Sequence, residues 1–160
     1  MNNMQSVRTM RLAARRRAFK RGQSAVELAF AVPLLILILQ IAADFGRLFY
    51  LNVEINGAAR AGAQYGANNV TTAADSAGII QAAKLGGADV QNMMSNVSAT
   101  QCTCATGTSI PACPASYCTA IPNATYVQVT VQATFKPLIT YPGLSSQVPL
   151  SAQAILPVQQ

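Results

Sequence analysis

The apolar positions near the N-terminus form one unbroken stretch rather than a periodic pattern. Residues 25–43 are aliphatic apart from four positions, which are Glu27, Phe30, Pro33 and Gln40. A stretch of about 19 residues is long enough to cross a bilayer as an α-helix, which needs roughly 20. The sequence therefore predicts a transmembrane helix whose membrane part covers about 25–44, with a kink at Pro33 because proline removes one backbone hydrogen bond.

Beyond the membrane part, apolar and small residues recur every three or four positions, which is typical of one face of a helix. The stripe consists of Phe45, Leu48, Leu51 or Asn52, Ile55, Ala58 or Ala59, Gly62, and Tyr65 or Gly66. We expect one continuous helix over 23–69, about 70 Å long at roughly 1.5 Å per residue. Ala58, Gly62 and Gly66 give this helix a small-residue face that suits close approach of another backbone. Fraying of the helix towards Asn69 is the alternative explanation of these glycines.

The pattern changes after residue 70. A second helix is expected from Thr71 or Thr72 to about Leu85 on its capping signal and apolar side, followed by a short turn or helix over 90–96. Alternation of apolar and polar residues predicts strands over 97–104, 126–135 and 148–156, with a turn at 141–143 before the last one. The expected fold class is α+β, a long N-terminal transmembrane helix continuing into a small headgroup, 70–160, whose antiparallel sheet packs on the outer half of the helix.

Positive charge is concentrated at the N-terminus. Seven of the eleven Lys and Arg residues precede Gly22, and no acidic residue lies among them. After Gly22, four basic residues face five acidic ones, so this part carries a net charge of −1 although the whole chain carries +6. Basic residues beside a membrane helix hold that end in the cytoplasm, so we expect the headgroup outside it. The nearly neutral remainder excludes a basic track for nucleic acid.

All four cysteines lie within one segment, at Cys102, Cys104, Cys113 and Cys118. Outside the cytoplasm, an even and clustered set predicts two disulfides in a loop over 102–118, with three pairings open. A zinc site is the alternative, but its usual pair of Cys-x-x-Cys knuckles does not match these spacings. No metal or other cofactor is expected.

No catalytic constellation is visible. The chain has no His, no phosphate-binding loop and no paired carboxylates. A redox dithiol at Cys102 and Cys104 is conceivable, but the loop holds no Lys, Arg or His that would lower a thiol pKa. The sequence therefore predicts no catalytic residues and a protein that is not an enzyme.

A specific arrangement surrounds the start of the apolar stretch. A basic leader ends at Gly22, and Glu27 is the fifth residue after it. This arrangement resembles the processing site of type IV prepilins and pseudopilins. The continuation to about residue 66 is similar to TadE-like minor pilins of the Tad (tight adherence) pilus system, with Pro33 early in the helix, Phe45-Gly46-Arg47 at its end, and 58–62 downstream. Leu28 departs from the family, which usually has an aromatic residue there.

The resemblance implies a function and a set of partners. It implies a leader over 1–22 that a prepilin peptidase removes between Gly22 and Gln23. It also implies that Glu27 attracts the new α-amine of a neighbouring subunit, so that the long helix assembles into a pilus. The implied partners are other pilins or pseudopilins, the peptidase, the Tad assembly platform and ATPase, and a secretin. The implied location is the inner membrane, single-pass, with the headgroup periplasmic or extracellular, in the service of pilus biogenesis and adhesion.

Other interpretations stay open at this point. Ser24 to Glu27 also matches a capping box, which would make Glu27 a helix-capping residue. Cyclisation of Gln23 after cleavage would remove the amine that Glu27 is expected to attract. The alternative for the whole chain is an uncleaved signal-anchored envelope protein with a disulfide-stabilised domain.

Overall fold

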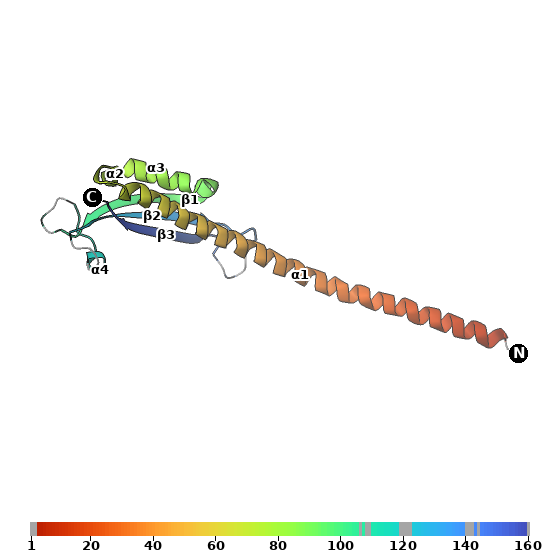
Figure 1. Ribbon diagram of the computed structural model, residues 1–160. Coiled ribbons are helices and arrows are strands. Elements are labelled where there is room, and N and C mark those ends of the chain that lie inside the picture. The colour runs from red at the N-terminus through yellow and green to blue at the C-terminus, as the bar shows by residue number, and fades with distance from the viewer. Residues whose placement is uncertain are drawn as a thin grey trace. The chain divides into compact units, whose positions relative to one another are not determined.

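The computed structural model describes the backbone of residues 3–105, 107, 110–118, 123–139, 143 and 145–159, with side chains from residue 23 onward. The elements, labelled in Figure 1, are α1 (Asn3–Ala67), α2 (Val70–Ala74), α3 (Ser76–Gly86), the 3-10 helix η1 (Ala88–Met93), β1 (Met94–Thr103), α4 (Ala115–Cys118), β2 (Thr125–Phe135) and β3 (Val148–Pro157). The chain divides into two compact units, an N-terminal unit (Met1–Phe45) and a C-terminal unit (Gly46–Gln160), and the division falls inside α1.

The N-terminal unit is helical throughout its described length. The helix begins at Asn3 and not at Gln23 as the sequence predicted. The reason is local, because 3–21 contains no Gly or Pro and is rich in Arg, Lys, Ala and Met, which favour helix. Pro33 lies inside α1, where it leaves one carbonyl without a helical donor.

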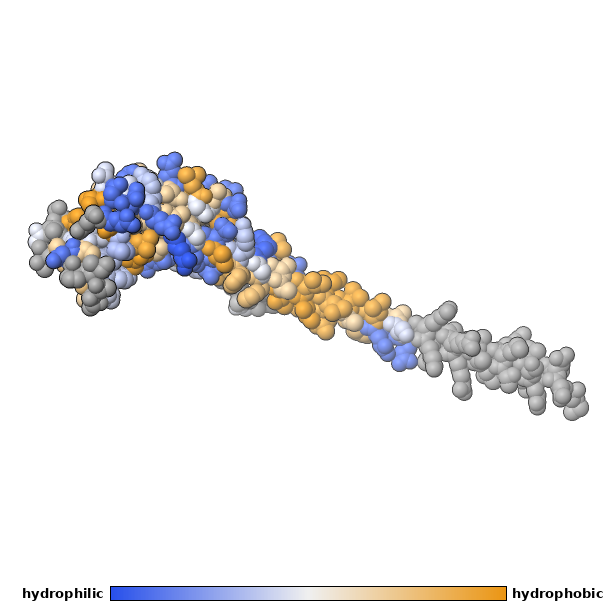
Figure 2. All heavy atoms as spheres, in the orientation of Figure 1, coloured by the Kyte–Doolittle hydropathy of each residue, from blue (hydrophilic) through white to orange (hydrophobic). Residues whose placement is uncertain are grey.

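Apolar side chains are exposed around the part of α1 that was predicted to cross a membrane. Val26, Leu28 and Phe30 are 57%, 63% and 79% exposed, and orange, apolar atoms cover this part of the helix in Figure 2. Within the described residues, α1 is the one helix long and apolar enough to span a bilayer. Large apolar side chains that have no contact within their own chain are expected of a helix that lies in lipid or packs against other helices.

The C-terminal unit contains the predicted antiparallel sheet, in the order β1-β2-β3. Val129 in the central strand pairs with Ala99 in β1 and with Ala154 in β3. The α+β fold class is therefore confirmed. Strand β1 begins at Met94, earlier than expected, across a register shift between Met94 and Asn96. The predicted turn at 141–143 lies outside the described residues except for Gly143, whose φ of +89° is in the left-handed region that favours glycine.

The core of this unit lies between the sheet and two helices. One face of β2 supplies Val127, Val129 and Val131, all fully buried, and α1 contributes Leu51 and Ile55. Figure 1 shows the C-terminal part of α1 together with α3 across one face of the sheet. The predicted stripe on α1 is thus correct in its middle.

The predicted stripe is wrong at its N-terminal end, where Phe45 is 67% exposed. At its C-terminal end, Gly66 is buried, whereas the alternative member Tyr65 is 39% exposed. The Tyr65 hydroxyl donates a hydrogen bond to Asp75 at 3.1 Å, which holds the side chain at the edge of the core and not inside it. A phenol needs such a partner, whereas Ile or Leu does not.

The predicted second helix is two helices. Asn69 and Thr72 form a capping box at the start of α2, with Thr72 N donating to Asn69 Oδ1 at 2.8 Å. The side chain of Asp75 then accepts a hydrogen bond from Gly78 N at 3.0 Å and caps α3. Asp favours such caps over helix interiors, so the chain breaks there. Leu85, expected on the apolar side of the helix, is 71% exposed.

Candidate assembly site on the N-terminal helix

Glu27 stands alone as a charge among exposed apolar side chains of α1. The amide Nε2 of Gln23, one helical turn earlier, donates to Glu27 Oε1 at 3.4 Å. Both residues are exposed, as are Val26 and Leu28 on either side of Glu27. In water the exposed carboxylate has no desolvation cost. Inside a membrane, a charged side chain costs about 2.5–3.5 kcal/mol of free energy even on insertion scales. The neutral amide of Gln23 leaves the negative charge of Glu27 uncompensated, so the site has the chemistry to bind a cation.

The expected cleavage point, between Gly22 and Gln23, lies within α1. Side chains of the leader, Gly22 included, fall outside the described residues. Ser24 is also inside α1, so in the uncleaved chain the capping box at Ser24 to Glu27 is not at a helix start. Such a cap can form only once the leader is removed.

The small residues of α1 face other elements of their own chain. Ala58 is fully buried. A Cβ on Gly62 would lie 2.9 Å from Ala83 Cβ and 3.0 Å from Ile79 O, both in α3. A Cβ on Gly66 would lie 2.8 Å from the Cγ1 atom of Val127 in β2. These glycines therefore let α3 and β2 approach α1 closely. The sequence predicted that the sheet packs on this part of the helix, but it did not predict that α3 lies there.

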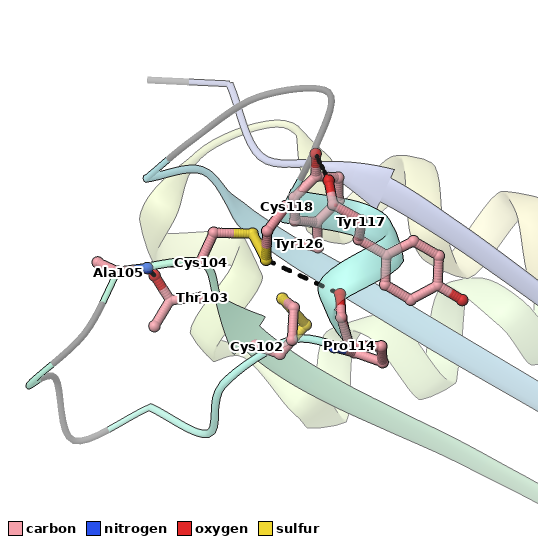
Figure 3. The surroundings of a disulfide bond; sticks show 9 residues. Cys102, Thr103, Cys104, Ala105, Pro114, Tyr117, Cys118 and Tyr126 are labelled. Atoms are coloured by element: carbon pink, nitrogen blue, oxygen red, sulfur yellow. Dashed lines mark hydrogen bonds between the residues drawn. A yellow bond between two sulfur atoms is a disulfide. The ribbon is translucent and has the colours of Figure 1, made fainter.

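Two disulfides close the loop that follows β1, and they confirm the reading of the cysteines as disulfides. Cys102 pairs with Cys113, and Cys104 pairs with Cys118, with Cα atoms 4.9 and 5.4 Å apart (Figure 3). The pairs are interleaved along the chain, one of the three pairings that the sequence left open.

Backbone hydrogen bonds hold the returning segment beside the end of β1. Thr103 N donates to Pro111 O at 2.9 Å, and Cys113 N donates to Thr103 O at 3.0 Å. The returning segment runs parallel to the end of β1, with Ala112 opposite Thr103. Cys113 therefore lies next to the part of β1 that carries Cys102, its disulfide partner.

The disulfides belong to a second, smaller apolar cluster. Its buried members are Cys102, Cys113, Ala124 and Tyr126. The Tyr126 hydroxyl donates to the Tyr117 carbonyl at 3.0 Å, and the two rings lie 6.1 Å apart (Figure 3). Because Tyr126 precedes Val127 in β2, it points to the opposite face of the sheet from the main core. The alternation of 126–135 predicted the strand but not this second cluster, since the cluster is made by residues from a loop.

The described residues offer little for catalysis or metal binding. No three His, Cys, Asp or Glu side chains among them lie close enough together to hold a metal ion. An open hollow of about 400 Å³ is lined by Arg47, Met93, Phe135 and Lys136 among others, and the Arg47 guanidinium lies 5.6 Å from the Phe135 ring centroid. The hollow has no acid or base pair of the kind that general acid–base catalysis requires.

Comparison with known proteins bears on the helix. A family model described as TadE-like protein matches residues 22–64. No curated protein and no solved structure matches the chain. The matched residues include Gly22, Glu27 and Pro33, and they end before the sheet and the disulfide loop. Over residues 22–64 the chain is therefore TadE-like, and the resemblance to pilus proteins of the Tad system that Gly22 and Glu27 indicated is confirmed.

Proposed function

We infer that this protein is a minor pilin or pseudopilin of a Tad pilus, cleaved between Gly22 and Gln23 and assembled through α1 for pilus biogenesis and adhesion. The observation that carries this proposal is the place of Glu27. It is the single carboxylate within the exposed apolar stretch of 25–43, and it lies in the segment that is TadE-like.

Assembly would follow from the cost of leaving Glu27 unpaired. Cleavage after Gly22 creates an α-amine at Gln23, one helical turn before Glu27. In apolar surroundings, the amine of a neighbouring subunit would neutralise Glu27 and fix the axial register of the two helices. Removing one partner of such a buried pair typically costs about 3–5 kcal/mol, because the other charge is left uncompensated.

The charge distribution supports an orientation. Seven basic residues before Gly22 favour a cytoplasmic N-terminus, with the C-terminal unit periplasmic or extracellular. The partners proposed are other pilins or pseudopilins, a prepilin peptidase, the Tad assembly platform and ATPase acting on the membrane helix, and a secretin.

The N-terminus of the membrane-extracted protein tests the processing. Intact mass and N-terminal peptide mass spectrometry should show a chain that starts at Gln23, and should also show whether the amine is free, methylated or cyclised. Gly22→Ala should retain the leader. A wild-type chain that starts at or near Met1 contradicts the proposal.

Glu27→Gln tests the role of the carboxylate. Gln can replace Glu in a capping box, so this variant keeps the cap and loses only the charge. We expect normal cleavage and a loss of assembly of tenfold or more, measured as the protein in sheared pilus fractions. Glu27→Asp, which keeps the charge on a shorter side chain, should retain part of the assembly. Full assembly of Glu27→Gln would show that Glu27 acts as a cap alone.

One observation favours a second candidate, an uncleaved signal-anchored envelope protein. Helix α1 is continuous across the Gly22–Gln23 bond up to Asn3. The same N-terminal mass measurement separates the two candidates.

A further inference from the structure

Strand β3 forms an edge of the sheet whose middle, between Pro149 and Pro157, lacks the usual protection of an edge. It pairs with β2 on one side, and no described strand pairs with its other side. Natural edge strands are commonly protected by charged side chains, by bulges or by proline, since their free N–H and C=O groups can pair with another chain. The ten residues of β3 carry no charge, and their register with β2 runs without a shift from Val148 to Pro157.

The backbone direction of β3 shows which groups are free. Just after the strand, Val158 N donates to Thr125 O at 2.8 Å, on the β2 side. Alternate residues of an antiparallel strand direct their N–H and C=O groups the same way. The backbone N–H and C=O groups of the even-numbered residues of β3 therefore point towards β2. Those of the odd-numbered residues point to the free edge, and among these Ser151, Gln153 and Ile155 have an N–H group to donate.

Two prolines bracket these free donors. Pro149 and Pro157 are also odd-numbered, so their backbone nitrogens lie on the free edge as well. Proline has no N–H group, so neither position can donate a hydrogen bond there. The free edge is thus a run of three donors between two positions that cannot donate. The run has its centre at Gln153.

The sequence around Gln153 is nearly the same in both directions. Residues 149–157 read PLSAQAILP. When two copies of this strand lie antiparallel with Gln153 opposite Gln153, proline lies opposite proline, leucine opposite leucine and alanine opposite alanine. Only Ser151 and Ile155 face unlike residues. The N–H groups of residues 151, 153 and 155 in each copy all meet carbonyl groups of the other.

We propose that the free edge of β3 binds β3 of a second copy of this chain, antiparallel and centred on Gln153. A second copy is the occupant that the edge fits, because it offers an uncharged strand with matching donors, matching side-chain sizes and prolines at the same limits. Such an interface is isologous, since the same surface serves both partners. This proposal does not depend on the function inferred above.

The direction of α1 in the C-terminal unit determines how the α1 helices of the two copies are oriented in the pair. Arg47 of α1 lies over Phe135, and Gly66 of α1 lies against Val127, so this part of α1 runs antiparallel to β2 and parallel to β3. A two-fold β3 pair therefore holds the two α1 helices antiparallel, and the two chains enter the pair from opposite ends. The two Gly46 residues, where the C-terminal units begin, then lie at opposite ends of the pair. Because the chains reach the pair from opposite ends, we expect copies anchored in different membranes to make this contact.

Vesicle clustering with charge-swapped variants tests the proposal. The full chain is reconstituted into uncharged phosphatidylcholine vesicles, and clustering is followed by light scattering. Wild-type vesicles should cluster. Gln153→Lys alone and Gln153→Glu alone should each reduce clustering at least tenfold, because like charges meet at the two-fold axis. A mixture of Lys and Glu vesicles should cluster again.

Controls use the neighbouring strand. Thr130 is the partner of Gln153 in β2 and lies on the same face of the sheet, one strand further from the proposed contact. Thr130→Lys should cluster like wild type, and intact mass should show that both disulfides are retained in every variant.

A covalent test uses Gln153→Cys. Opposed residues in a hydrogen-bonded antiparallel pair have Cα atoms about 5.5 Å apart, within the range that a disulfide spans, about 4.4–6.8 Å. Gln153→Cys should therefore give a disulfide-linked dimer on non-reducing gels, and Thr130→Cys should not. The proposal is overturned by clustering of Gln153→Lys vesicles alone, by a mixture that stays dispersed, by wild-type vesicles that never cluster, or by equal cross-linking of the two cysteine variants.

Discussion

At the scale of the residue, the glycines of α1 differ in what surrounds them. A Cβ on Gly66 would lie 2.8 Å from Val127 Cγ1 and 2.9 Å from Ile79 Cδ1, both in the buried core. A Cβ on Gly57 would meet nothing within 4 Å. The same residue type therefore has a packing role at one position and only a cost in helix propensity at the other.

Substitution of these two glycines by alanine should have opposite effects on stability. Gly57→Ala should raise the free energy of unfolding by roughly 0.5–1 kcal/mol through helix propensity. Gly66→Ala should lower it by about 1–3 kcal/mol, because the added methyl overpacks the core. Chemical denaturation followed by circular dichroism measures both, and equal effects at the two positions would contradict the packing role of Gly66.

Asp75 joins two residues at the break between α2 and α3. One carboxylate oxygen caps α3 through Gly78 N, and the other accepts the hydrogen bond from the Tyr65 hydroxyl at 3.1 Å. This hydrogen bond, together with the negative charge of Asp75, raises the pKa of Tyr65 above its ordinary value. The protonated phenol is thus favoured in the folded protein. Its contribution to stability is complete below a pH of about 10 and is lost as the pH rises through the raised pKa.

Asp75→Asn separates the charge from the cap. Asn also caps helices, so α3 should keep its start while the pKa of Tyr65 falls towards its ordinary value. Ultraviolet absorbance titration measures the change, with Tyr65→Phe identifying the signal of that residue. An unchanged Tyr65 titration in Asp75→Asn would show that the carboxylate does not interact with the phenol.

At the scale of the element, the two disulfides differ in their surroundings. Cys102 and Cys113 are buried in the second apolar cluster, whereas Cys104 and Cys118 are only partly buried at its border. The two bridges span 11 and 14 residues of sequence. Loop entropy alone would make the two disulfides similar in the stability that they add, at about 3 kcal/mol for a loop of this size. Any difference between their contributions should therefore come from packing.

Paired Cys→Ser substitutions test this difference. Removal of Cys102 and Cys113 should lower the free energy of unfolding more than removal of Cys104 and Cys118, since it also places two hydroxyls in an apolar cluster. Both losses should fall in the range of about 2–5 kcal/mol. Denaturant unfolding of the two double variants measures them, and an equal loss would assign the whole effect to chain entropy.

At the scale of the whole molecule, charge is divided unevenly along the chain. From residue 90 to the C-terminus, Lys136 is the only charged residue. The N-terminal leader holds most of the basic residues. We therefore expect the orientation of the protein in a membrane to depend on the leader.

Replacement of the basic cluster of the leader by glutamine should disturb this orientation. The change covers Arg15, Arg16, Arg17, Lys20 and Arg21. In spheroplasts, added protease should digest the C-terminal unit of the wild type and leave an appreciable fraction of the variant protected. Arg60→Gln with Lys84→Gln, which removes charge from the C-terminal unit, serves as the control and should behave as wild type. Full digestion of the leader variant would show that other features fix the orientation.

Sequence patterns identified the elements whose structure follows from one simple pattern of apolar and polar residues. The alternation of 126–135 predicted β2 to within a residue, and the unbroken apolar stretch of 25–43 predicted the exposed segment of α1. The break between α2 and α3 at Asp75 was missed. The helical pattern continues on both sides of Asp75, and only the hydrogen bond of its side chain shows that a new helix starts there. The disulfide pairing was left open, since it depends on the path by which the loop returns to the end of β1.

For the candidate site, the sequence offered only the chemistry of the residues. The spacing of Gly22 and Glu27 predicts a processing and assembly site, and this stays a prediction. Residue size identified the small-residue face of Ala58, Gly62 and Gly66. Which elements approach those small residues depends on contacts between segments distant in the chain, with Ile79 and Val127 in particular. The free edge of β3 likewise becomes visible only when the strand order is known.

The helix that carries Glu27 is also part of the core of the C-terminal unit, where Leu51 and Ile55 are buried against the sheet. Within the C-terminal unit, α1 is therefore a part of the core and not an appendage of it. A displacement of α1 along its own axis would have to break its side-chain contacts with the sheet together, so we expect this part of the helix to unfold with the sheet and not before it.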